Sequence, residues 1–342
     1  MEMAQKYVWE GAIPLQIHLH HSEVTSHPPP PAALVLAPRV SYLPLLLPLV
    51  KPHFATTLPP GIDTIWFEYK GLPLKWYIPT GVLFDLLCAE PERPWNLTVH
   101  FRSYPSNALI PCDGEDSVKW NFMNSLKEAD YIVNGNCKNV MHMSQSDQTE
   151  LWQSVLNANL DAYQKASIKL KLGFVEDVYP LQQNLQQLKA PKANKDGDSP
   201  RHAKAEKIPI RLYVRHVNKD FEELEEMAEV DSWDQVSYIN RPLDFCREEG
   251  RCFTLNDALK ALLPELLSKQ CTTTREDAHD FEKDKTDESS NALVDAELKL
   301  WRIQGIQPKL EIPFSWLANN LKHPEHFLHI CLFVKLSHTT HS

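Results

Sequence analysis

The stretch Ile13-Pro-Leu-Gln-Ile-His-Leu-His-His21 alternates between apolar and polar side chains. Its apolar positions are Ile13, Leu15, Ile17 and Leu19, each two residues from the next. A period of two is typical of a β-strand that buries one face, because successive side chains point to opposite sides. We therefore predict a first strand whose odd-numbered side chains face a core.

Alternating strands and helices continue from this strand to about residue 101. The patterns predict a strand at 34–36, an irregular helix at 42–54, a hairpin made of 65–71 and 74–78, a helix at 82–87 and a strand at 95–101. The resulting order, ββαββαβ, can pack its helices on one face of a mixed sheet.

The middle third of the chain lacks strand patterns. Val118, Phe122, Leu126 and Ala129 recur at helical spacing, so we predict that this third is helical. A polar segment rich in helix-breaking residues follows at 189–207 and predicts a linker.

The last third returns to strand patterns. They predict strands at 208–215, 301–306 and 327–334, and helices after Thr254 and at 315–321. Thr254 and Asp257 have the spacing of a helix N-cap and its acidic partner. This order echoes the first third, which predicts two similar modules with a helical insert between them. Segments near 217–249 and 271–298 are dense in Asp and Glu, and we predict that they are acidic disordered insertions.

The composition excludes several classes of protein. The chain has 342 residues and a formal net charge of −10, and nucleic-acid binding needs clustered Lys and Arg, so we expect no nucleic-acid partner. The longest apolar run, 43–50, is broken by Pro44 and Pro48 and is too short to cross a bilayer. No secretory leader pattern is present, so we expect a cytoplasmic protein.

No motif has the spacing of a cofactor or metal site. The seven cysteines are scattered without a C-x-x-C pair, and the chain has only 10 Gly and no phosphate-binding loop. His18 and His20 share one face of the predicted strand, but no Cys, Asp or Glu cluster completes a metal site. We therefore predict no cofactor and no metal.

One lysine stands beside the apolar stripe of a predicted helix. The segment Asn121-Phe-Met-Asn-Ser-Leu-Lys-Glu-Ala-Asp130 is amphipathic, with Lys127 at the edge of the stripe. Taken alone, a helical lysine next to Glu128 and Asp130 is an ordinary solvated residue. The two acids could position the amine, but adjacent acids also favour its charged form, so we assign them no catalytic role.

A series of blocks along most of the chain resembles the autophagy protein 5 family. The blocks include Val8-Trp-Glu-Gly-Ala-Ile-Pro14, Pro94-Trp-Asn-Leu-Thr-Val-His-Phe101 and Lys127-Glu-Ala-Asp130, together with the segments at 38–43, 65–69, 73–76, 83–87 and 327–330. The resemblance implies an α+β fold with two ubiquitin-like (β-grasp) domains flanking a helix-rich domain. The implied division is an N-terminal helix at 1–10, a first ubiquitin-like domain at 11–104, a helix-rich domain at 115–188, a linker at 189–207 and a second ubiquitin-like domain at 208–338.

The resemblance also implies a covalent partner. Lys127 would carry the C-terminal glycine of the ubiquitin-like autophagy protein 12 through an isopeptide bond. Such a bond forms when a deprotonated amine attacks a thioester held by a separate conjugating enzyme. The acceptor must therefore be exposed and held in place.

A second implied partner is a helix of autophagy protein 16, which would bind a groove formed by the N-terminal segment and both ubiquitin-like domains. Our candidates for part of that groove are Tyr7, Val8 and Trp9, an apolar cluster at a polar terminus. The alternative is that Trp9 packs on its own domain.

The assembled complex resembles an E3-like factor of autophagosome formation. It would bring a lipid-conjugating, E2-like enzyme to the forming autophagosome membrane and promote the attachment of phosphatidylethanolamine to another ubiquitin-like protein. Membrane contact would be peripheral and through local Lys and Arg. Two alternatives stay open: a thiol-dependent conjugation enzyme that uses one of the cysteines, and an adaptor with no covalent step.

Overall fold

The alternating stripe of the first strand is buried. Ile13, Leu15, Ile17 and Leu19 are each at most 9% exposed, so the predicted inward direction is confirmed. β1 (Ala12–Leu19) pairs antiparallel with β2 and parallel with β5, in a sheet of order β2-β1-β5-β3-β4. The remaining elements of this first domain are η1 (His21–Glu23), β2 (Ala33–Pro38), η2 (Leu43–Leu46), α2 (Leu47–Phe54), β3 (Trp66–Tyr69), β4 (Leu72–Pro73), α3 (Thr80–Leu87) and β5 (Trp95–His100).

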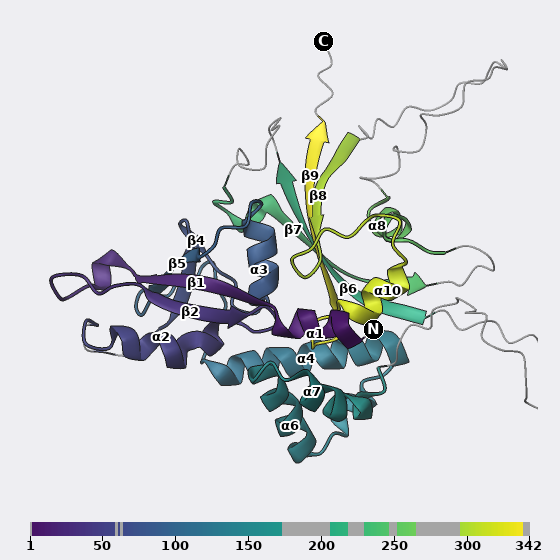
Figure 1. Cartoon of the computed structure of the whole chain (residues 1–342), viewed down its shortest axis with the longest axis horizontal. Helices are drawn as coiled ribbons and strands as arrows, with labels where there is room; N and C mark the ends of the chain where they lie inside the picture. The colour runs from purple at the N-terminus through teal and green to yellow at the C-terminus, as the bar shows by residue number, and fades with distance from the viewer. Residues whose placement is uncertain are drawn as a thin grey trace, which may run out of the picture.

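Two sheets and a set of helices make up the protein (Figure 1). The computed structural model describes residues 2–58, 61, 64–172, 206–217, 229–245, 252–264 and 295–337. In Figure 1 the first sheet lies at the left, the second at the upper right and the helical domain below them, with the N-terminal helix α1 (Glu2–Glu10) near the centre. No helix in these ranges combines the length and the apolar character that crossing a bilayer requires.

The second sheet repeats the arrangement of the first. β6 (Glu206–Val217) and β9 (Leu328–Ser337) pair in parallel at its centre, as β1 and β5 do in the first sheet. The order is β7-β6-β9-β8, and the other elements are η5 (Trp233–Gln235), β7 (Val236–Phe245), α8 (Leu255–Leu262), β8 (Asp295–Arg302) and α10 (Phe314–Asn320). The prediction of two similar α+β modules is confirmed, and α8 begins with the predicted capping box of Thr254 and Asp257.

The middle third is helical, as predicted. It consists of α4 (Glu115–Asn134), α5 (Lys138–Met141), α6 (Gln145–Leu156), α7 (Leu160–Ser167) and η3 (Ile168–Leu170). Val118, Phe122, Leu126 and Ala129 are each 0% exposed, so the stripe read from their spacing is the buried face of α4. Val118, Phe122 and Leu126 belong to the same apolar core as the inner face of the second sheet.

Two predicted acidic insertions contain strands. The segment near 217–249 was predicted to be disordered, but Val236–Phe245 forms β7 and pairs with β6 over its whole length. The segment near 271–298 likewise includes the start of β8. Both are edge strands whose outward side chains are largely polar. The apolar pattern in each sequence segment is therefore weak, and the strands were not predicted there. Of the first segment, residue 217 ends β6 and residues 229–235, which include η5, precede β7. The remainder of both segments and most of the linker at 189–207 lie outside the described residues, although the linker's last two residues open β6.

The second strand of the predicted hairpin was placed wrongly. Segment 74–78 was predicted to be a strand, but only Leu72–Pro73 forms β4. Leu74, Trp76 and Ile78 are buried in alternation without strand pairing, and the Ile78 N–H donates to the Lys75 carbonyl in a turn. Alternating burial alone therefore imitated a strand.

Two arginines of the second domain join it to the first. Arg215 donates to the Leu86 carbonyl at 3.2 Å, and Arg302 donates to the carbonyls of Cys88 and Ala89. These carbonyls lie at the C-terminal end of α3, where helical hydrogen bonds run out and the helix dipole favours cations. The two α+β modules are thereby fixed against each other.

Candidate functional site

The predicted acceptor lysine lies on the longest described helix. α4 begins after Gly114 with Glu115 and Asp116, whose negative charges suit the positive end of the helix dipole. It ends at Gly135, which adopts the left-handed conformation and donates to the Tyr131 carbonyl at 2.8 Å. With both ends capped or charge-matched and its apolar face buried, α4 is a rigid support.

Lys127 is half-buried on this helix and its amine contacts neutral groups. Nζ lies 3.4 Å from the Asn124 side-chain oxygen and 5.6 Å from the centre of the Trp120 ring. Among the described residues these are its only polar or ring contacts, so no carboxylate pairs with it. The amine is held loosely, without an ion pair that an incoming group would have to break.

A hollow of about 400 Å³ adjoins Lys127. Its lining includes Trp120, which is 66% exposed, and Met141, which is 63% exposed, together with Met123 and Lys119. Large apolar side chains exposed around an amine can contact an apolar segment of another protein.

The three residues after Lys127 anchor the helix. The Glu128 carboxylate lies 3.1 Å from the Arg211 guanidinium of β6. Ala129 is fully buried in the core. Asp130 is also fully buried, and its carboxylate accepts from the Val140 N–H at 3.2 Å, which ties α4 to α5. Both acids therefore have structural partners.

Tyr7, Val8 and Trp9 lie in different environments. Tyr7 is 71% exposed, whereas Val8 and Trp9 are 7% and 4% exposed. The Trp9 ring packs on Tyr163 of α7 with ring centres 4.6 Å apart. Trp9 thus packs on the helical domain, and it also forms one wall of a larger groove.

This groove has a volume of about 500 Å³ and lies between α1, the end of α7 and the segment after α10. We call it the N-terminal groove and define it by Trp9, Tyr163, Ile168, Leu172, Lys322 and His326. The lining is more apolar than polar, and Ile168 is 76% exposed. Such a groove between helices suits the apolar face of a partner helix.

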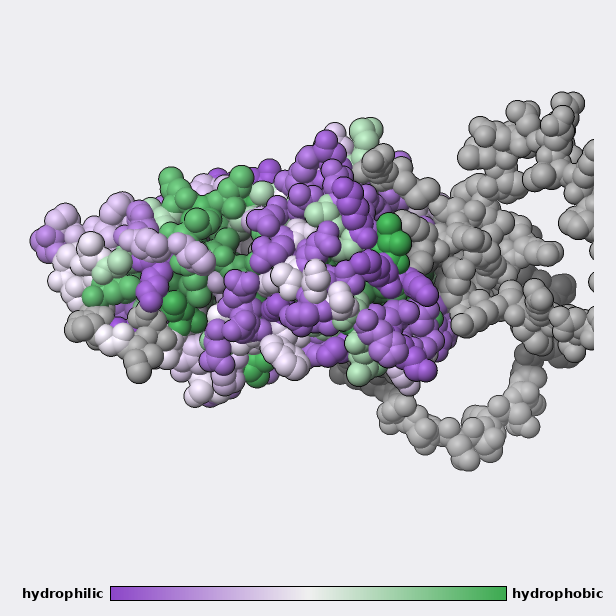
Figure 2. Space-filling view, turned by 90° about the horizontal axis from the view of Figure 1, so that it is seen from below, coloured by the Kyte–Doolittle hydropathy of each residue, from purple (hydrophilic) through white to green (hydrophobic). Residues whose placement is uncertain are grey.

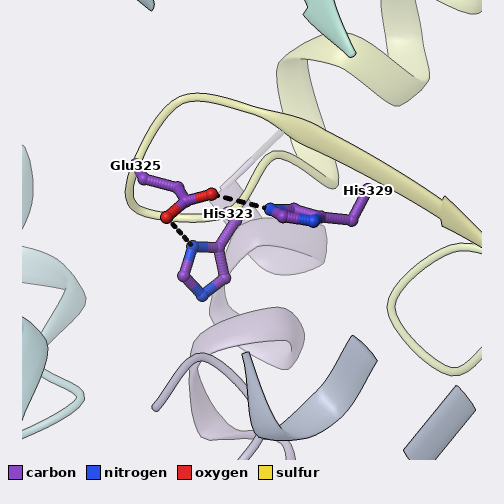
Figure 3. A group of neighbouring side chains, drawn as sticks. All are labelled: His323, Glu325 and His329. Atoms are coloured by element: carbon purple, nitrogen blue, oxygen red, sulfur yellow. Dashed lines mark hydrogen bonds and ion pairs between the residues drawn. The ribbon is translucent and has the colours of Figure 1, made fainter. Parts of the chain in front are cut away.

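A cluster of His323, Glu325 and His329 could be taken for a metal site, since one ligand atom of each lies within 4.8 Å of the others (Figure 3). However, the Glu325 carboxylate already accepts from Tyr42 at 2.8 Å, from His329 at 3.0 Å and from Arg211. The Arg211 guanidinium supplies the positive charge that a metal ion would bring, and it would repel such an ion. These residues therefore form a hydrogen-bonded junction.

The charges at this junction follow from burial. Burial alone would raise the pKa of the Glu325 carboxyl, but Arg211 and the hydrogen bond from His329 hold that pKa well below its usual range. Burial lowers the pKa of His323 to about 3 and also lowers the pKa of His329. Because Arg211 also donates to Ser125 of α4 at 3.0 Å, the junction joins all three domains.

The described cysteines do not form an evident nucleophilic site. Burial raises the pKa of the Cys88 thiol to about 12, and it raises the pKa values of Cys112 and Cys331. A thiol enzyme needs a thiolate, and these three environments oppose it. The other thiols are half-buried, exposed or outside the described residues: Cys137, Cys252, Cys246 and Cys271.

A hydrophobic surface covers part of the first domain. In Figure 2 it appears in green at the left, whereas the surface to its right is largely hydrophilic. Leu34 and Leu36 of the edge strand β2 are 77% and 66% exposed, and Leu49 of α2 is 62% exposed. Nothing in the structure shows what covers this face, and we assign it no partner.

Sequence reasoning missed Lys322, Arg211 and Glu325. Their roles come from contacts across the chain, such as the hydrogen bond from Tyr42 to Glu325, 283 residues apart. A local signal did exist: Lys322-His-Pro-Glu-His326 places four titratable side chains directly before the buried strand β9.

Comparisons with known proteins agree across the chain. Family models described as autophagy protein ATG5, UblA domain, alpha-helical bundle region and UblB domain match residues 8–101, 115–173 and 207–332. "Autophagy protein 5" of Arabidopsis thaliana is 62% identical over 332 residues, which cover 97% of this chain and 98% of the relative. "Autophagy protein 5" of Oryza sativa subsp. indica is 52% identical over 358 residues, covering 97% and 93%.

A solved structure has the same fold. The "Crystal structure of Kluyveromyces marxianus Atg5" aligns with a TM-score of 0.62 at 20% identity, covering 97% of this chain and 99% of that one. The expected arrangement of two ubiquitin-like domains flanking a helical domain is confirmed.

Proposed function

The chain belongs to the autophagy protein 5 family, and from this membership we propose that it is a non-catalytic scaffold of autophagy that is conjugated through Lys127 to autophagy protein 12. The observation that carries the proposal is the placement of Lys127. Its amine contacts only neutral groups among the described residues, at the surface of a helix whose next three residues are anchored.

The proposed chemistry joins two proteins. The Lys127 amine, once deprotonated, attacks the carbonyl carbon of a thioester between the terminal glycine of autophagy protein 12 and a cysteine of a separate conjugating enzyme. A C–N bond forms, the C–S bond breaks, the thiolate leaves and the amine loses a proton to solvent. The role of this chain is to present the amine, so the anchoring of α4 supports the proposal.

A denaturing gel of cell extract tests this step. The wild-type chain is expected to give a shifted band that survives reducing agent, and Lys127→Arg is expected to abolish it. Lys119→Arg is the matched control, because Lys119 lies on the same helix and lines the same hollow. A shifted band that persists in Lys127→Arg, or peptide mapping that places the branch elsewhere, would contradict the proposal.

The same gel separates the alternatives. A thiol enzyme would give a band that reducing agent removes, and burial of Cys88 and Cys331 opposes that function. An adaptor with no covalent step would give no shifted band in either form.

We also propose that the N-terminal groove binds a helix of autophagy protein 16. The size and apolar lining of the groove support this role, and of the three residues predicted for the site, Trp9 lines it. The assembled complex would act in the manner of an E3 ligase. It would bring the lipid-conjugating, E2-like enzyme to the forming autophagosome membrane, through peripheral contact from the cytoplasm, and promote phosphatidylethanolamine attachment to a ubiquitin-like protein.

A variant of the groove tests partner binding. Ile168→Glu places a charge at an exposed apolar position of the lining. It is expected to weaken binding of the partner helix about tenfold without changing the thermal midpoint, because the carboxylate replaces an apolar contact with the helix. Unchanged affinity would contradict the assignment of the groove.

A further inference from the structure

The N-terminal groove has an unusual balance of charge. Its lining contains two lysines, Lys171 and Lys322, and two histidines, His323 and His326, but no Asp or Glu. The whole chain carries a formal charge of −10, so a groove without any acid departs from the average surface. An apolar groove with positive charge favours an apolar occupant that carries negative charge.

Lys322 is one of the two lysines that line the groove. Its side chain is half-buried, and it forms no hydrogen bond or ion pair with any residue that the structure describes. Burial lowers the pKa of its amine to about 8. A buried amine is stabilised when a carboxylate pairs with it, and no carboxylate of the described residues pairs with Lys322.

Two further polar atoms beside it also lack partners. Within the described residues, Nε2 of His326 and the side-chain oxygen of Asn320 accept or donate no hydrogen bond, and both residues line the groove. Buried polar groups are normally paired, so these two atoms at the groove wall are available to hydrogen-bond an occupant. By contrast, Gln5 already bonds to Asn319 at 2.8 Å and to Gln164 at 3.1 Å, which closes α1 onto its neighbours.

We propose that the occupant is an amphipathic helix that carries a carboxylate within its apolar face, and that Lys322 forms the ion pair with it. This inference rests on the proposed helix-binding role of the groove and adds the residue that selects the helix. Apolar side chains of the helix would contact Ile168 and Leu172, while the carboxylate would reach the amine between them. Helices without that acid would leave Lys322 desolvated and unpaired, which penalises them.

A double-mutant cycle tests the proposal. The probes are a synthetic peptide of the partner helix and a set of peptides in which one Glu or Asp at a time becomes Gln or Asn. One amide peptide is expected to bind the full-length wild-type chain about tenfold more weakly, the size of a charge-assisted hydrogen bond. The same peptide is expected to bind Lys322→Met no worse than the parent peptide does.

Lys165→Met is the matched control, because Lys165 is exposed on α7 and lies outside the groove lining. It is expected to leave every affinity unchanged. The inference would be overturned if the ratio of the parent peptide's affinity to the amide peptide's affinity were the same for the wild-type chain and for Lys322→Met. That result would leave the groove's proposed function intact. Absence of any peptide binding to the wild-type chain would overturn both, and displacement of the peptide by dodecanoate without any coupling to Lys322 would assign the groove to a small amphiphile instead.

Discussion

The Glu128 carboxylate lies 3.1 Å from the Arg211 guanidinium, so the residue directly after Lys127 is joined to the second sheet. Asn240 of β7 donates to the same carboxylate at 2.6 Å. Arg211 in turn pairs with the buried Glu325 at the junction of the three domains. The helix that presents the amine is therefore held by the arginine that also neutralises the junction.

Arg211→Met is expected to be far more destabilising than Glu128→Gln. The first change leaves the Glu325 carboxylate buried without its cation, which costs about 3–5 kcal/mol. The second removes a pair in which the Glu128 side chain is 41% exposed, and it costs about 1 kcal/mol or less. Urea unfolding of both variants checks the contrast, and equal losses of free energy would show that Arg211 does not carry the junction.

Gly305→Ala is expected to destabilise the contact between the two ubiquitin-like domains. Gly305 has φ +81°, and a Cβ there would lie 2.9 Å from the Arg39 guanidinium carbon. Arg39 pairs with the buried Asp85 at 2.5 Å, and Asp85 accepts from the Gly305 N–H at 2.7 Å, so the methyl group disturbs a connected set.

Gly71→Ala is the control for this substitution. Gly71 has a similar φ of +86° but nothing within 4 Å of the added Cβ. Both variants pay about 1 kcal/mol for the left-handed backbone, and Gly305→Ala is expected to cost about 1–3 kcal/mol more from the close contact. Thermal unfolding measures the difference; equal midpoints would mean that Arg39 moves aside freely.

Local periodicity explains what could be predicted from the sequence. The strand of Ile13 and Leu15 and the helical stripe of Phe122 and Leu126 were found because each element repeats its apolar residues along a single segment. β7 was missed because it is an edge strand whose outward residues are polar, and acidic segments surround it.

The candidate site was only partly predictable. Lys127 was identified through resemblance, since its local pattern is that of an ordinary solvated lysine. The junction of Arg211 with Glu325 brings together residues 114 positions apart, and no local pattern encodes such a contact. Trp9 was recognised as significant, but whether it packs internally or faces a partner depends on the position of Tyr163, which only the fold supplies.

Stability is expected to fall as the pH drops below about 6.5. Burial lowers the pKa values of His323 and His326 from 6.5 to about 3, so between these values the unfolded chain binds more protons than the folded protein does. The pKa of Glu325 is also depressed in the folded protein, from 4.5, which adds a further loss below about pH 4.5. All three contributions are fully present above their unfolded pKa values.

Urea unfolding at pH 7.5, 6, 5 and 4 measures this dependence. His326→Gln is expected to flatten the decline between pH 6.5 and 5, because it removes one of the histidines whose pKa burial lowers. A free energy of unfolding that stays constant from pH 7.5 to 5 would contradict the assignment of neutral, buried histidines.

Trp120→Ala is expected to slow conjugation at Lys127 without unfolding the protein. The Trp120 ring lies 5.6 Å from the amine and is 66% exposed, so it restricts the amine and can contact the incoming protein. Loss of about 1 kcal/mol of contact between the Trp120 ring and the incoming protein corresponds to a rate about fivefold lower in a reconstituted reaction. Tyr131→Ala, which removes another exposed aromatic of α4, is the control, and an equal effect of the two changes would exclude a specific role for Trp120.

Binding of the partner helix is expected to weaken above about pH 8. Burial lowers the pKa of the Lys322 amine to about 8 in the free protein. The titratable groups that line the groove with it are Lys171, Tyr163, His323 and His326, and none of them is Asp or Glu. Pairing with a carboxylate raises the pKa of the Lys322 amine. Above about pH 8 the amine of the free protein has lost its proton, so binding of the helix then requires the uptake of a proton. Affinity is then constant well below pH 8 and falls about tenfold per pH unit above it, until the pKa of the bound state is reached. Lys322→Arg keeps its charge throughout and is expected to lose this dependence. Titration calorimetry between pH 7 and 9.5 compares the two chains, and parallel curves would show that the amine of Lys322 does not meet the helix.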